Sequence, residues 1–247
     1  MAEFSIIDTY FNRKSPHSVD LGVGDDSALL TPPPQQQLVI CADTLVAGRH
    51  FPLDTSPHAI GWKSVAVNLS DIAAMGAKPQ SILLALSLPQ IDHDWLKGFS
   101  QGLYDCCDKF GVSLIGGDTT QSPHLTISVT ALGWVNIGQA VTRSAAQVGD
   151  LICVSGTVGD AAFALQHLGH PLQHRLDYPT PRCELGQALK GLAHSMIDVS
   201  DGLAQDLGHI LKASHVGATL QLDQLPINTT LQDLSLIHIS EPTRRRG

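Results

Sequence analysis

The 247-residue chain lacks the motifs of the common nucleotide-binding folds. It contains no G-x-x-x-x-G-K-S/T phosphate-binding loop and none of the protein-kinase catalytic motifs. The segment Gly22-Val23-Gly24 lacks the third glycine of a dinucleotide-binding fingerprint. Ordinary P-loop NTPases, protein kinases and Rossmann dehydrogenases are therefore excluded.

Basic residues and paired cysteines are also scarce. The 15 Lys and Arg residues are outnumbered by 23 Asp and Glu, so the formal net charge is -8. This charge argues against nucleic acid or an anionic membrane as a partner, and an anionic substrate would need a cationic intermediary. The five cysteines show no C-x-x-C spacing, and no signal peptide or transmembrane span is apparent. We expect no zinc site, and we expect a reduced cytoplasmic location.

The length and the hydrophobic content of 43% allow one large or two ordinary domains with substantial cores. We place the domain boundary near residues 143–150, where the order of elements restarts. This boundary predicts an N-terminal domain over residues 1–143 and a partial C-terminal α+β domain over residues 144–234. Residues 113–115 and 125–131 are expected to form strands in the first domain, and residues 151–155 are expected to open the second domain as a strand.

A predicted helix carries the carboxylate around which the rest of the chain is organised. Ser56 and Pro57 supply its N-terminal signal, and Gly76 ends it. Its apolar stripe, which we expect in the core, is Ala59, Trp62, Ala66, Leu69 and Ala73. The opposite face carries Ser64, Asn68 and Asp71. Most helical aspartates lie on a solvated face, so Asp71 alone does not indicate a site.

Other aspartates recur after apolar runs or within Gly-rich turns, where α/β proteins place ligands. These residues are Asp25, Asp26, Asp43, Asp118, Asp198 and Asp201. If they converge, two charges about 4 Å apart repel by roughly 4 kcal/mol at a protein-surface dielectric. Hard divalent cations could neutralise such a cluster, and Mg²⁺ usually bridges protein carboxylates to phosphates. The sequence therefore predicts a metal-nucleotide site, with solvated aspartates as the alternative.

Five segments resemble, in order, the successive motifs of the thiamine-monophosphate kinase family: GVGDD (22–26), DTLVAGRHF (43–51), VNLSDIAAMGAKP (67–79), IGGDTT (115–120) and IDVSDG (197–202). The resemblance covers about residues 4–231. It implies an α+β protein with the two-domain architecture of aminoimidazole ribonucleotide synthetase, usually a homodimer. It also implies transfer of the γ-phosphoryl group of ATP to thiamine monophosphate, which makes thiamine diphosphate.

The resemblance also implies roles for single residues. Mg²⁺ ligands would be Asp26, Asp43, Asp71, Asp118, Asp198 and Asp201. ATP would be contacted by Gly117, Asp118, Arg143 and Ser200, and the substrate by His50. No catalytic base is expected, because the second pKa of a substrate phosphate is about 6 and its terminal oxygen is already largely anionic at neutral pH.

The chain departs from the family pattern at two places. Cys41 and Ala42 stand where relatives commonly carry hydroxyl residues, so only main-chain carbonyls could act as ligands there. The resemblance stops after Leu234, and residues 235–247 are expected to be a non-native tail, with a natural basic tail as the alternative. Since a Gly-Gly-Glu-Asp segment and a late aromatic residue are absent, the C-terminal domain is expected to be truncated.

Two other functions remain open at this stage. One is another ATP-dependent enzyme of the same superfamily, of the selenophosphate or aminoimidazole ribonucleotide synthetase type. A selenophosphate synthetase would need a reactive cysteine in its N-terminal loop, and no cysteine precedes Cys41. The other is a non-catalytic acidic dimerisation module whose aspartates are merely solvated.

Overall fold

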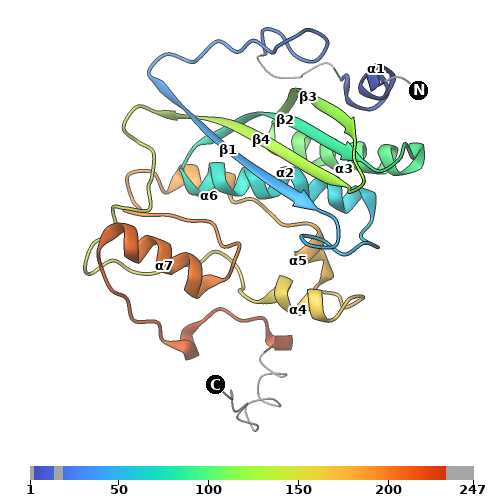
Figure 1. Cartoon of the computed structure of the whole chain (residues 1–247). Helices are drawn as coiled ribbons and strands as arrows, with labels where there is room; N and C mark the ends of the chain where they lie inside the picture. Colours follow the sequence, from blue (N-terminus) through green and yellow to red (C-terminus); the bar gives the residue numbers. More distant parts are fainter. Residues whose placement is uncertain (1–2, 14–18, 232–247) are drawn as a thin grey trace.

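The structure is a computed structural model that describes residues 3–13 and 19–231, so the predicted tail at 235–247 lies outside the described residues. The N-terminal part contains a four-stranded sheet with strand order β1-β4-β2-β3 (Figure 1). Its strands are β1 (Gln36–Val46), β2 (Lys78–Leu88), β3 (Ser113–Gln121) and β4 (Thr126–Asn136). Strand β4 pairs antiparallel with β1 and β2, whereas β2 and β3 are parallel.

Two long helices cover one face of this sheet (Figure 1). Helix α2 (Pro57–Ala74) begins as predicted, because the Ser56 side chain accepts a hydrogen bond from the backbone N–H of Ala59. Helix α3 (His93–Phe110) ends at Gly111, which adopts the left-handed conformation typical of a helix C-terminus. Between these helices and the sheet lies the core, which includes Leu69, Ile72, Phe99, Leu103, Ile127 and Val129. The N-terminal segment is helical, with α1 (Glu3–Ile6) followed by the π-helix η1 (Ile7–Phe11).

The second face of the sheet carries exposed apolar side chains. Leu38 on β1 pairs with Trp134 on β4, and Ile40 pairs with Leu132. Leu38 is 42% exposed and Ile40 is 57% exposed. In the part of the chain that the structure describes, α2 and α3 lie on the other side and leave this face open.

The C-terminal part contains short helices: α4 (Asp160–Gln166), α5 (Gln173–Asp177), α6 (Cys183–Ala188), α7 (Leu203–Ser214) and the 3-10 helix η2 (Leu222–Gln224). The predicted strand at residues 151–155 is wrong, because this segment has no regular secondary structure. Leu151 is 89% exposed and Ile152 is 43% exposed. A strand is completed by hydrogen bonds to a neighbouring strand, and no described strand pairs with this segment.

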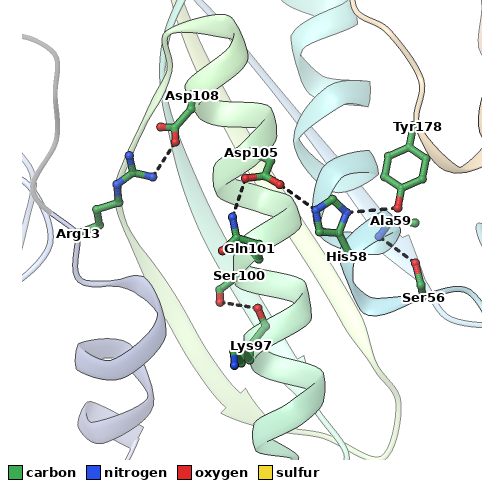
Figure 2. A network of polar contacts seen from close by, with 10 residues as sticks. All are labelled: Arg13, Ser56, His58, Ala59, Lys97, Ser100, Gln101, Asp105, Asp108 and Tyr178. Carbon is green, nitrogen blue, oxygen red and sulfur yellow. Dashed lines mark hydrogen bonds and ion pairs between the residues drawn. The ribbon is translucent and has the colours of Figure 1, made fainter.

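Polar contacts fasten the C-terminal part to α2 and α3 (Figure 2). The His58 ring lies between the Asp105 carboxylate, at 2.9 Å from Nε2, and the Tyr178 hydroxyl, at 3.2 Å from Nδ1. Beside it, the Trp62 indole N–H donates to the carbonyl of Pro179 at 2.9 Å. Among the described residues no helix is both long and apolar enough to cross a membrane.

Gly102 allows α2 and α3 to pack closely. A Cβ atom at this position would lie 1.9 Å from the carbonyl oxygen of His58. Gly102→Ala should therefore lower the free energy of unfolding by about 1–3 kcal/mol, because the two helix backbones must separate. Urea denaturation measures the change.

The matched control is Gly208→Ala in α7, where an added Cβ meets nothing within 4 Å. Because alanine favours the helix and restricts the unfolded chain, this variant should be neutral or more stable by up to about 1 kcal/mol. Equal destabilisation by the two substitutions would contradict the proposed reason for the glycine.

Candidate active site

Asn68 joins the two segments that carry Asp43 and Asp71. Its side-chain oxygen accepts a hydrogen bond of 3.0 Å from the backbone N–H of Asp43 on β1. Its amide nitrogen donates to the carbonyl of Ser64, one turn earlier on α2, at 3.0 Å. Asn68 and Ser64 are each 1% exposed, so this part of the face opposite the apolar stripe is buried and not solvated. Sequence spacing missed Asn68 because its bonding partner lies 25 residues away.

Asp43, Asp71 and Asp198 lie close enough to repel one another. Burial raises the pKa of Asp71 to about 6, and the negative charges of Asp198 and Asp43 contribute to the increase. Burial also raises the pKa of Asp198. Arg143 acts in the opposite direction on both carboxyls. The structure thus brings four of the predicted site residues into one electrostatic cluster.

Cys41 also lines this cluster. Its thiol lies 3.3 Å from the carbonyl oxygen of Asn68, in donor geometry. Burial raises the pKa of Cys41 to about 12, and Asp71 and Asp43 raise it further. The thiol is therefore protonated at neutral pH and acts as a hydrogen-bond donor. Because only a thiolate is a good metal ligand, Cys41 is a poor candidate for a metal ligand.

Asp118 does not join the cluster within one chain. It lies inside β3 and not in a turn after it, and β3 and β1 form opposite edges of the sheet. Three strand spacings separate them, which amounts to about 14 Å. The strand pairing aligns Asp118 with Ala85, Ser128 and Thr44, which share one face of the sheet. This is the open face, whereas the next residue of β1, Asp43, faces α2. The expectation that Asp118 converges with Asp43 in one chain is therefore wrong.

The remaining predicted residues lie on exposed loops or strands. Asp26 is exposed and its backbone N–H donates to the neighbouring Asp25 carboxylate. Asp201 is exposed and accepts a hydrogen bond from Gln205 at 3.2 Å. Gly117, at φ +147°, packs so closely on β2 that an added Cβ would lie 1.8 Å from the carbonyl oxygen of Leu84.

The ring and the carbonyl of His50 already form hydrogen bonds with neighbouring residues. Its Nδ1 accepts a hydrogen bond of 2.9 Å from the backbone N–H of Val46, and its carbonyl accepts one from Lys63. A cavity of about 280 Å³ lies beside this loop. It is lined by Ala47, Phe51, Leu53, Ile60, Pro89, Trp95, Pro123, His124 and Leu125. The cavity is mostly apolar and could accept a flat, weakly polar ring.

A second cavity, of about 430 Å³, opens beside Arg143. Its other lining residues are His209, Lys212, Ala213 and His215 on and after α7. Arg143 and Lys212 are permanent cations in a chain with a net charge of -8. This local excess of positive charge suits an anionic group such as a phosphate.

The carboxylate cluster fits Mg²⁺ by its donor chemistry. Among residues 3–13 and 19–231, no group of three or more His, Cys, Asp or Glu side chains is already arranged to hold a metal ion. However, Asp198 and Asp43 both raise the pKa of Asp71, in addition to the effect of burial, and Arg143 opposes them only in part. Carboxylate oxygens are the ligands that Mg²⁺ prefers, and a bridging phosphate would complete its coordination.

Comparisons with known proteins agree with this architecture. Residues 24–135 match the family "AIR synthase related protein, N-terminal domain", and residues 147–244 match "AIR synthase related protein, C-terminal domain". The fold and the site thus define a protein of the AIR synthase related class. The chain is 49% identical over 242 residues to thiamine-monophosphate kinase from Escherichia coli, an alignment that covers 93% of this chain and 74% of that protein.

Solved structures support the same relationship. The crystal structure of thiamine-monophosphate kinase from Stenotrophomonas maltophilia is 48% identical, with a TM-score of 0.85 over 95% of this chain and 79% of that one. The structure of AaThiL complexed with AMPPCP and TMP is 29% identical, with a TM-score of 0.77 over 84% and 70% of the two chains. The chain belongs to the thiamine-monophosphate kinase family and is an enzyme of the phosphotransferase class, as its motifs indicated.

The raised pKa of Asp71, caused first by burial and then by the charges of Asp198 and Asp43, predicts a pH-dependent stability. The pKa of Asp71 is raised from 3.8 to about 6 on folding, so the folded chain binds more protons between these values. Its contribution therefore lowers stability as the pH rises through this range. Without added metal, Asp71→Asn removes the buried charge and its repulsion, and it should raise Tm at pH 7 by roughly 2–4 °C for each kcal/mol of this penalty, and by less toward pH 4.

Calorimetry of both proteins across this pH range measures the difference. Asp223→Asn, at an exposed position in η2, is the control and should leave Tm unchanged. A difference between Asp71→Asn and the unaltered chain that does not depend on pH would contradict the assigned cause.

Proposed function

We propose that the chain transfers the γ-phosphoryl group of ATP directly to thiamine monophosphate with Mg²⁺, giving thiamine diphosphate and ADP. The observation that carries this proposal is the cluster of Asp43, Asp71 and Asp198 beside Arg143. Its support from relatives is the 49% identity to a thiamine-monophosphate kinase and the related structure that binds AMPPCP and TMP. The same identity favours this acceptor over those of other enzymes in the superfamily.

The reaction forms a bond between an oxygen of the acceptor phosphate and the γ-phosphorus, and it breaks the bond between the γ-phosphorus and the β-phosphate oxygen. The acceptor oxygen is already anionic at neutral pH, so no side chain has to remove a proton. The main obstacle is the repulsion between the phosphates of the two substrates. Bound Mg²⁺ supplies charge neutralisation and alignment for this in-line displacement.

The residues of the chain provide the binding framework. Asp43, Asp71 and Asp198 would hold Mg²⁺, and the Arg143 guanidinium would donate hydrogen bonds to phosphate oxygens. The cationic cavity beside Arg143 extends this phosphate-binding surface. Further roles in metal, ATP or substrate binding are proposed for Asp26, Asp118, Asp201, Gly117, Ser200 and His50.

We propose that the active form is a homodimer that packs through the open face of the sheet. Its support is the exposed apolar surface around Leu38 and Ile40 on β1, because a sheet face of this kind is normally covered. Asp118 lies on the same face. If Asp118 serves the metal-nucleotide site, it must do so from a second copy of the chain.

Asp71→Asn should reduce turnover at least about tenfold, which corresponds to about 1.4 kcal/mol of transition-state stabilisation. The substitution preserves side-chain size but removes the proposed metal ligand. Thiamine diphosphate formation from ATP, Mg²⁺ and thiamine monophosphate is the measurement. Asp94→Asn, at an exposed position on α3, is the control and should retain full turnover. Unchanged Mg²⁺-dependent turnover of Asp71→Asn would count against the assignment.

Mixed dimers of Asp71→Asn and Asp118→Asn test the contribution of a second copy. If the two residues of one site come from different subunits, each mixed dimer has one unaltered site. Random mixing of the two inactive variants should then restore about a quarter of the activity of the unaltered dimer. No recovery would place both residues in one subunit, and full activity of Asp118→Asn alone would remove Asp118 from the site.

A further inference from the structure

Asp206 holds the loop that follows Asp198. It lies in the first turn of α7 and is only 3% exposed. Its Oδ2 accepts three backbone hydrogen bonds, from the N–H groups of Ser200 at 2.9 Å, Asp201 at 3.1 Å and Gly202 at 3.1 Å. A single carboxylate oxygen thus binds three successive peptide groups.

These three bonds determine the local backbone conformation. Gly202 has φ +120°, a backbone angle that residues other than glycine rarely adopt. The turn therefore requires both this glycine and a hydrogen-bond acceptor from outside the turn. Bonds to an ionised carboxylate are shorter and stronger than bonds to a neutral acceptor. Without Asp206, three neighbouring N–H groups would lose this acceptor, and the loop would be free to take other conformations.

Helix α7 also connects this loop to Arg143. At its C-terminal end, the Ser214 hydroxyl donates to the carbonyl of Arg143 at 2.8 Å and accepts from the backbone N–H of Ala146 at 3.0 Å. At its N-terminal end, Asp206 holds residues 200–202. The helix therefore links the backbone of Arg143 to the loop that carries Asp198.

We infer that Asp206 is a positioning residue for the nucleotide site: it shapes the 198–202 loop so that Asp198, Ser200 and Asp201 face Mg²⁺-ATP together. This inference rests on the function proposed above. Asp206 would act on the nucleotide through the loop, because its Oδ2 accepts hydrogen bonds from three peptide groups of that loop. Nothing in the motif resemblance pointed to Asp206, which lies four residues beyond its last segment.

The test compares Asp206→Ala and Asp206→Asn in the full chain. The probe is Mg²⁺ with AMPPCP, measured by isothermal titration calorimetry. Asp206→Ala should weaken binding by about 10–100-fold, the range found when supporting partners of a metal site are removed. Asp206→Asn keeps an uncharged oxygen in place of Oδ2, which accepts weaker hydrogen bonds, so this variant should weaken binding measurably but less than Asp206→Ala does. Asp223→Ala, in η2 away from the loop, should bind like the unaltered chain.

Two further readouts separate positioning from general stability. Hydrogen exchange should show faster exchange at the amides of residues 200–202 in Asp206→Ala. The KM for ATP should rise, whereas the KM for thiamine monophosphate should stay the same within about twofold. A lower Tm with unchanged AMPPCP affinity would make Asp206 a purely structural residue and overturn the inference. If Asp206→Ala does not fold, the test relies on Asp206→Asn. Amide exchange at residues 200–202 and AMPPCP affinity equal to those of the unaltered chain would then overturn the inference.

The failure of the inference and the failure of the proposed function give different results. If the unaltered chain binds Mg²⁺-AMPPCP and the Asp206 variants bind it equally well, only the role of Asp206 is wrong. If the unaltered chain shows no magnesium-dependent binding, the metal-nucleotide site itself is wrong, and the positioning role falls with it.

Discussion

Repulsion among Asp43, Asp71 and Asp198 is the constraint on which the site depends. These carboxylates come from a strand, a helix and a loop that are distant in sequence. Burial is the largest cause of the raised pKa of Asp71, and the charges of Asp198 and Asp43 add to it. Asn68 offsets part of this cost by tying α2 to β1, and Arg143 provides the neighbouring positive charge. A cation that binds only the folded chain would stabilise it by mass action. The neighbouring carboxylates that destabilise the empty site would therefore also favour binding of Mg²⁺ together with the substrate.

The same arrangement links assembly to activity in the proposed mechanism. Helix α2, which carries Asp71, and helix α3 cover one side of the sheet, whereas the open side carries Asp118 and apolar side chains. Two surfaces of one sheet therefore serve different purposes. One forms the core and supports the carboxylate cluster, and the other is available for a second subunit.

Local signals predicted the elements whose boundaries depend on nearby residues. Ser56 caps α2 as predicted, since capping involves only residues a few positions apart. The alternation of residues 125–131 predicted the inward face of β4 correctly. The strand expected at residues 151–155 failed, because its apolar composition could not reveal that the described chain offers it no pairing partner.

The sequence by itself determined the core helices, the family and the aspartates that resemble its motifs, because periodicity and motif order are written along the chain. Only the tertiary structure decided which aspartates meet. The strand order β1-β4-β2-β3 places Asp43 and Asp118 at opposite edges, and a long-range hydrogen bond joins the buried Asn68 to Asp43. Strand order and such contacts arise from pairing between distant segments, which local spacing does not encode.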